Sequence, residues 1–181
     1  MAPKPAAAQI ERCGEDHLEF ETAVREHQGL VYSMAYHFLG NRAVAEELAQ
    51  DVFLSLYRNF RNIKSGSHLV FWLRKVTSHR CLDYIRGQKH RAHLSLEEVR
   101  ERPLKHQDPD PFISGHLRRM VTSLPEKARI VVVLRYQEDL TPTEISEILE
   151  MPVNSVKSHL RRSLALLREK MSSRLKVEPH E

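Results

Sequence analysis

Apolar residues recur at intervals of three and four along most of this chain, and that period constrains the fold more than any other feature. Such stripes run through about residues 17–39, 42–60, 68–91 and 116–137. The last stripe is Val156, Leu160, Leu164, Leu167 and Met171. These intervals are typical of helices that bury one face. Aromatic residues make up only 7% of the chain, which also favours helices over a β-sandwich. The sequence therefore predicts an all-α fold.

The helical pattern stops once, between residues 88 and 115. This stretch contains Pro103, Pro109 and Pro111, the last two within "DPDP", and little apolar periodicity. Such composition is typical of a linker. We therefore expect two small helical domains, 17–91 and 116–176, joined by a flexible linker at 92–115 and preceded by a disordered tail at 1–16. A break at Gly29 would split the first helix in two.

Charge is distributed unevenly along the chain. Residues 11–56 hold nine acids and three bases, a balance of −6. Residues 71–91 hold six bases and one acid (+5), and residues 151–176 hold seven bases and one acid (+6). Two basic segments and one acidic segment indicate a polyanionic partner together with a second, cationic partner.

The stretch "LTPTEISEILEMPVNSVKSHLRRSLALLREK" at 140–170 reads as a helix-turn-helix. Thr141 with Glu144 forms a capping box, a second one is expected from Ser123 with Glu126, and "EMP" turns the chain. In such a unit the first helix braces the second, whose N-terminal part enters a major groove. The polar residues off the apolar stripe of the second helix are Asn154, Ser155, Lys157, Ser158, Arg161 and Arg162. The alternative to DNA binding is a basic helix face that is exposed to solvent and binds no partner.

Two helices in the middle of the chain carry further candidate binding surfaces. On 42–60 a second stripe of Glu47, Asp51, Leu54 and Arg58 faces away from most of the apolar one, which suits contact with a basic helical partner. Helix 68–91 sets cations beside aromatic residues, a combination that suits melted nucleic acid because it offers phosphate contacts and stacking faces. A solvated, salt-bridged face is the alternative for both helices.

Three segments resemble bacterial RNA polymerase sigma factors of the extracytoplasmic-function (ECF) class. "AEELAQDVFLSLYRNF" at 45–60 looks like their core-binding helix, and "FWLRKVTSHRCLDYIRGQKHR" at 71–91 looks like their promoter-melting and minus-ten-reading helix. Residues 124–170 look like their minus-thirty-five-reading domain. The resemblance covers about 17–172. His79, Glu150 and His159 depart from it, because relatives often carry Asn, Gly and Arg there.

The resemblance implies roles for named residues. The clamp coiled coil of the largest core polymerase subunit would bind Glu47, Gln50, Asp51, Leu54 and Arg58. Melted minus-ten DNA would bind Lys64, Ser65, Arg74, Lys75, Ser78, His79, Arg86, Lys89 and Arg91. Duplex minus-thirty-five DNA would bind the six polar residues of 154–162. The resemblance leaves open whether an anti-sigma factor also binds the chain.

Other function classes have less support. A helix-turn-helix regulator that works without polymerase would explain 123–176 but leave 42–91 without a role. No P-loop, GxGxxG, HExxH or GxSxG motif indicates an enzyme. His90 and His93 with Cys81 match no standard metal spacing, so no cofactor or metal is expected. Two cysteines fit a reducing cytoplasm, and no apolar run approaches a membrane span.

Overall fold

The computed structural model describes the backbone of residues 6–94 and 115–175, and side chains within 19–88 and 117–172. Every regular element in these ranges is helical, which confirms the predicted all-α fold. The N-terminal unit consists of α1 (Ala6–Leu39), α2 (Arg42–Asn59), the short 3-10 helix η1 (Phe60–Asn62) and α3 (Gly66–Leu94). The C-terminal unit consists of α4 (Gly115–Thr122), α5 (Glu126–Tyr136), α6 (Pro142–Leu149) and α7 (Val153–Leu175). The predicted linker lies almost wholly outside the described residues.

Helix α1 is longer than the sequence suggested. It begins at Ala6, so residues 6–16 are helical where a tail was expected, and it continues through Gly29 without a break. A glycine inside a helix costs about 1 kcal/mol relative to Ala. The apolar residues that follow Gly29 outweigh this cost, because Val31, Met34 and Phe38 are fully buried.

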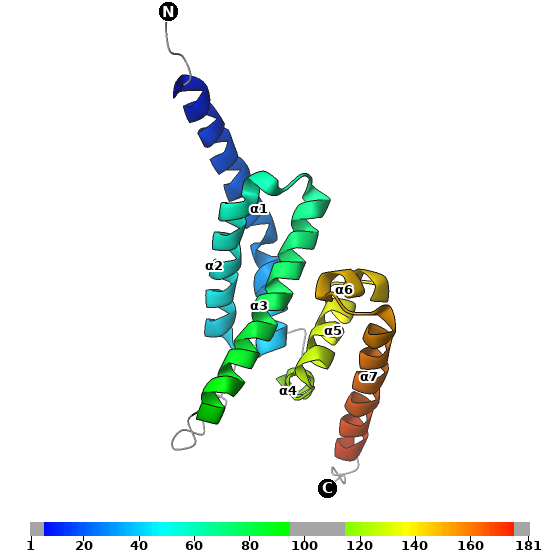
Figure 1. The fold of residues 1–181 in the computed structure, drawn as a ribbon. Coiled ribbons are helices and arrows are strands. Elements are labelled where there is room, and N and C mark those ends of the chain that lie inside the picture. Colours follow the sequence, from blue (N-terminus) through cyan, green and yellow to red (C-terminus); the bar gives the residue numbers. More distant parts are fainter. Residues whose placement is uncertain (1–5, 95–114, 176–181) are drawn as a thin grey trace, which may run out of the picture.

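The apolar stripes of the N-terminal unit pack together as a three-helix bundle (Figure 1). Helix α2 is capped by Asn41, whose side chain accepts a hydrogen bond from the backbone N–H of Val44. Its buried residues, Ala45, Leu48, Val52 and Leu56, recur at the intervals of three and four that the sequence predicted for this helix. Helix α3 adds Leu69, Leu73 and Leu82 to the same core.

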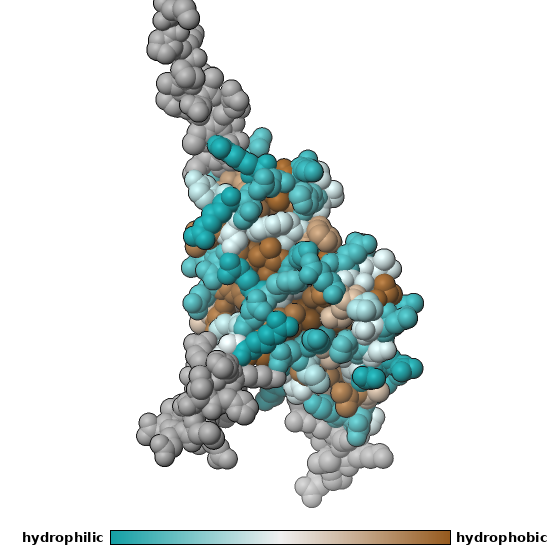
Figure 2. Space-filling model, in the orientation of Figure 1, coloured by the Kyte–Doolittle hydropathy of each residue, from teal (hydrophilic) through white to brown (hydrophobic). Residues whose placement is uncertain are grey.

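The two units pack directly against each other. Helix α6 lies beside α3, and α4 and α5 contact α1 (Figure 1). One apolar cluster runs from α1, α2 and α3 into α5, α6 and the start of α7. Polar residues cover most of the face in Figure 2, and hydrophobic residues show mainly as patches along the middle of the molecule.

Polar contacts join the units at the C-terminal end of α1. The guanidinium of Arg129, from α5, donates to the carbonyl of Phe38 at 3.0 Å and also to the carbonyls of Thr122 and Leu124. Gly40, just after α1, has a φ of +70° and lies so close to Thr122 that an added Cβ would come within 2.9 Å of its methyl group. We call the whole contact between the units, from this end of α1 to α3 and α6, the seam.

Candidate protein and nucleic-acid interfaces

The outer face of α2 carries all five residues expected to bind core polymerase. Glu47, Gln50, Asp51, Leu54 and Arg58 lie at the surface, and the Leu54 side chain is 56% exposed. Tyr57, one turn further along α2, is also exposed, and two neighbouring exposed apolar residues favour an interaction surface more than a single one would.

One of these acids already has a partner within the N-terminal unit. Arg80 of α3 donates to Asp51 at 3.2 Å and to the hydroxyl of Ser55 at 2.6 Å. These contacts join α2 to α3 at the edge of the outer face.

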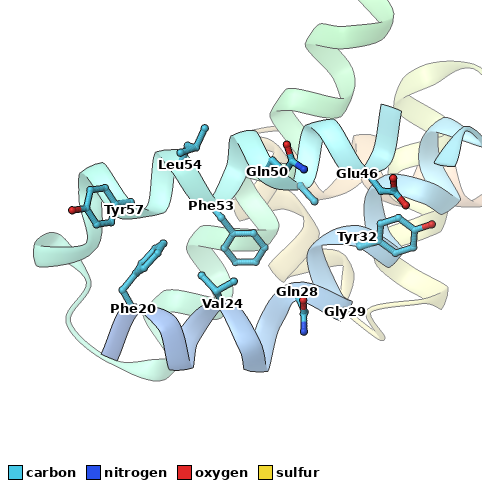
Figure 3. Close-up of a pocket in the computed structure, with 11 residues that line it drawn as sticks. Phe20, Val24, Gln28, Gly29, Tyr32, Glu46, Gln50, Phe53, Leu54 and Tyr57 are labelled. Carbon is cyan, nitrogen blue, oxygen red and sulfur yellow. The ribbon is translucent and has the colours of Figure 1, made fainter. Parts of the chain in front are cut away.

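A groove between α1 and α2, which the sequence did not indicate, borders this face. It has a volume of about 870 Å³, and the α2 residues Gln50, Phe53, Leu54 and Tyr57 form one wall. Phe20 forms part of the opposite wall, with its ring 5.2 Å from that of Tyr57 in an edge-to-face arrangement. Figure 3 shows Phe53 pointing from α2 towards α1. The polar stripe of α2 and this apolar groove therefore form one continuous surface.

The residues expected to bind minus-ten DNA fall into two groups. Lys64, Ser65 and Arg86 belong to the first group and are accessible to solvent. Ser65 also accepts a hydrogen bond from the backbone N–H of His68 at 3.2 Å, so it caps the start of α3. Arg86 pairs with Asp83 at 3.1 Å. The side chains of Lys89 and Arg91 lie outside the described residues.

The second group lies on one face of α3, and the C-terminal unit contacts three of its four residues. Arg74, Lys75 and His79 are partly buried, and Ser78 is fully buried. The structure thus brings these four residues together, as helical spacing requires, but it places them at the seam rather than in solvent.

The helix-turn-helix has the predicted form. Thr141 and Glu144 make the expected capping box, with Pro142 in the first turn of α6. The hydroxyl and backbone of Thr141 hydrogen-bond the Glu144 carboxylate and hold its pKa below the ordinary value. Residues 150–152 turn the chain into α7, which buries Val156, Ser163 and Leu167.

The polar face of α7 is open. Asn154, Lys157, Arg161 and Arg162 are exposed, while Ser155 and Ser158 are partly buried. The three cations form no ion pair with any side chain that the structure describes. His159 lies at the edge of this face, and its pKa is lowered by burial and by the nearby charges of Arg162 and Lys127.

Metal-ligand clusters and membrane-spanning helices were sought in the described part of the chain, and neither is present there. None of its His, Cys, Asp and Glu side chains cluster as metal ligands. Cys81 is a buried free thiol whose pKa is raised by desolvation. None of the described helices combines the length and hydropathy needed to cross a bilayer.

Taken together, the fold and the open basic helix define a two-unit, all-helical protein with a helix-turn-helix of the DNA-binding kind. Profiles of two families match: Sigma-70 region 2 over residues 23–91, and Sigma-70, region 4 over residues 115–167. The chain is 27% identical to the ECF RNA polymerase sigma factor SigW of Bacillus subtilis, over 94% of this chain and 97% of the relative. It is 31% identical to the RNA polymerase sigma-E factor of Streptomyces avermitilis, over 87% of each.

Two solved structures share the fold. The sigma factor RpoE of Bartonella quintana, in complex with the anti-sigma factor NepR, superimposes with a TM-score of 0.68 at 17% identity, over 85% of this chain and 97% of that one. CnrH in complex with the cytosolic domain of CnrY gives a TM-score of 0.59 at 17% identity, over 85% of this chain and 88% of that one.

The chain belongs to the RNA polymerase sigma factors of the ECF class. It is a transcription initiation factor that binds core RNA polymerase and directs it to promoters. A regulator that works without polymerase is not favoured, because the region 2 match accounts for the very segment that this alternative leaves without a role.

Proposed function

We propose that the sigma-factor activity is divided among three surfaces of this chain. The outer face of α2 binds the clamp coiled coil of core polymerase. The basic face of α3, with the segment at 61–68 from the end of η1 to the first turn of α3, holds the melted minus-ten strand, and the N-terminal half of α7 binds the minus-thirty-five duplex. These surfaces belong to a region 2 domain at 17–91 and a region 4 domain at 116–176.

The observation that carries the first assignment is the exposed acidic stripe with Leu54 at its centre. A basic coiled coil complements its charge, and the neighbouring groove offers apolar area. The test is Glu47→Lys with Asp51→Lys, titrated against core polymerase. Like charges opposed across an interface can cost several kcal/mol, so we expect affinity to fall by more than about a hundredfold.

The matched control is Glu19→Lys with Glu26→Lys. These acids are also exposed, and their spacing of seven places them on one face of α1, away from Phe20 and the groove. The control makes the same change in net charge on the same unit and should keep wild-type affinity. Equal affinity of both double variants for core polymerase would refute the α2 assignment.

The exposed cations of α7 support the second assignment, because unpaired Lys and Arg on a recognition helix can reach phosphates and guanine. We expect Lys157→Ala and Arg161→Ala to weaken promoter binding by the holoenzyme and leave core binding unchanged. A lost phosphate contact reduces the salt slope by roughly 1, and a lost base contact costs about 1–3 kcal/mol and relaxes specificity. Arg168→Ala, further along α7, is the control that should behave as wild type.

His79 is proposed to influence selection of the minus-ten element. Its Nε2 lies 3.2 Å from the carbonyl of Ile148 across the seam. Imidazole and carboxamide differ in shape and in hydrogen-bonding pattern. We therefore expect His79→Asn to change preference in promoter libraries randomised at the minus-ten element and to leave minus-thirty-five preference unchanged. If His79→Asn and the wild type show the same minus-ten preference, the only role left for His79 is its contact with α6.

The same family resemblance supports the remaining proposals. An anti-sigma factor binds this chain and holds it inactive, and the RpoE relative was solved in complex with such a factor, NepR. The chain acts in the cytoplasm, where core polymerase is found. It contributes no catalytic group of its own, so the bond-forming chemistry of transcription belongs to the polymerase.

A further inference from the structure

Three basic side chains lie together on one flank of α7. His159 is partly exposed there, and the exposed Arg162 follows it three residues later on the same side of the helix. Helices α5 and α7 pack side by side (Figure 1). The exposed Lys127 of α5 lies close enough to His159 for the two side chains to interact electrostatically. We call Lys127, His159 and Arg162 the flank cluster.

Within the described residues, the charges that act on His159 are all positive. They are those of Arg162, on its own helix, and of Lys127, on α5. Glu126 is next to Lys127 in the sequence, but its charge acts on Arg129. No carboxylate that the structure describes on α4, α5, α6 or α7 is among the charges that act on His159. Burial and this repulsion hold the pKa of His159 below its ordinary value, so the imidazole is mostly neutral near pH 7.

The flank cluster lies where a helix in a major groove would meet the DNA backbone. An α-helix with its side chains is about 10–12 Å across, and the major groove is about 12 Å wide. A helix in the groove therefore turns its central face to the base edges and its flanks to the phosphates that border the groove. Lys157 and Arg161 belong to the central face. Arg162 is already among the residues proposed to bind DNA, whereas Lys127 and His159 have no role there so far.

A phosphate bound among these side chains would favour the charged form of His159. The anion offsets the repulsion from Lys127 and Arg162, and it accepts a hydrogen bond from an imidazolium N–H. Both effects raise the affinity of His159 for a proton when DNA is bound. Because linkage is reciprocal, protonation of His159 strengthens DNA binding by the same factor.

We propose that Lys127, His159 and Arg162 form a proton-linked phosphate site: the DNA backbone beside the minus-thirty-five element binds there, and His159 takes up a proton as it does so. The inference rests on the duplex binding proposed for α7. It adds two contact residues, Lys127 and His159, and a dependence on pH. Affinity for DNA rises as the pH falls through the range in which His159 is neutral in the free chain and charged in the complex. It becomes constant once the free chain is protonated as well.

Duplex binding by the full-length chain at several pH values tests the role of His159. The probe is a fluorescently labelled duplex of random sequence, followed by anisotropy at low salt, because a phosphate contact does not depend on sequence. We expect the dissociation constant to fall roughly threefold to tenfold between about pH 7.5 and 6. His159→Gln should remove most of this gain. His159→Arg stays charged throughout, so it should bind at about pH 7.5 as tightly as the wild type does at about pH 6. Circular dichroism at each pH checks that the variants are folded.

The salt dependence of the same binding tests Lys127. Lys127→Ala should weaken duplex binding and reduce the salt slope by roughly 1, as the loss of a phosphate contact does. The matched control is Arg168→Ala, which makes the same change in net charge at an exposed position further along α7. This control should keep the wild-type salt slope and pH dependence.

A pH dependence that is unchanged in His159→Gln, or a salt slope that is unchanged in Lys127→Ala, would overturn the proposal. Lys157→Ala separates that failure from failure of the proposed function. If Lys157→Ala weakens binding while the Lys127 and His159 variants bind as wild type, α7 binds DNA by its central face without these two residues. If Lys157→Ala also binds as wild type, or if the wild-type chain binds no duplex at low salt, the assignment of duplex DNA to α7 fails as well.

Discussion

Replacing Arg129 tests how strongly the two units are joined. Arg129→Met keeps most of the aliphatic stem but removes the guanidinium, which donates to the carbonyls of Phe38, Thr122 and Leu124. It also removes a cation stacked 5.3 Å from the centre of the Phe38 ring. The first carbonyl belongs to the last turn of α1, the second to the last residue of α4 and the third to the α4–α5 connection, so a single side chain joins both units.

The size of the effect follows from these contacts. A hydrogen bond that involves a charged group contributes about 1.5–3 kcal/mol. Three such bonds must be discounted, because the partly buried guanidinium loses hydration on folding, which also lowers the pKa of Arg129, and because bonds that share one side chain are not additive. We expect Arg129→Met to lower the free energy of unfolding by about 2–3 kcal/mol. For a chain of this size, that corresponds to a fall in Tm of about 5–10 °C.

The assay is thermal and urea denaturation followed by circular dichroism, with two comparison variants. Arg129→Lys keeps the charge but not the forked geometry, so it should fall between wild type and Met. Arg135→Met removes an arginine from the same helix that reaches only one carbonyl, that of Leu140, and should cost about 0.5–1.5 kcal/mol. A loss for Arg129→Met no larger than that for Arg135→Met would refute the reasoning.

Two further predictions concern single residues. Gly40→Ala should cost about 1–2 kcal/mol in urea denaturation, because the left-handed φ disfavours a Cβ and because that atom would press on Thr122; an unchanged midpoint would contradict this. His159 should make the folded chain less stable in mild acid. Burial and two neighbouring cations lower its pKa in the folded state, so the unfolded state binds the proton more tightly and stability falls as the pH drops below about 6.5. His159→Gln should make the free energy of unfolding less dependent on pH between about pH 7 and 5. The same pH dependence in the variant and the wild type would show that His159 does not cause the loss of stability in acid.

Helices were predictable from the sequence because their signals are local. The apolar stripe of α2 and the capping box at Thr141 each depend on residues within one or two turns, and both are confirmed. The expected capping box at Ser123 does not form. Pro125 occupies the N-cap position of α5, and the Ser123 hydroxyl instead donates to the carbonyl of Met120 at 2.7 Å. The motif was present, but the proline placed the helix start two residues later.

The seam and the groove could not be predicted, because they join residues that are distant along the chain. Arg74 and Glu138 are separated by 64 positions, and no period in the sequence links them. The exposed residues of α2 and α7 were found because polar stripes beside apolar ones are visible in the sequence. Whether a basic face such as that of α3 is open or covered depends on tertiary packing, which composition does not encode.

The ion pairs of the seam also limit how freely the two halves of this protein can be exchanged with those of relatives. Glu138 and Glu150 recognise Arg74 and Lys75 in a way that depends on both halves together, much as paired subunits recognise each other by complementary charge. A chimera that joins this N-terminal half to a C-terminal half with glycine in the turn would keep every helix but lose one of these partners. Each half could then be exchanged without loss of its own fold, but the ion pairing between the two halves would be incomplete.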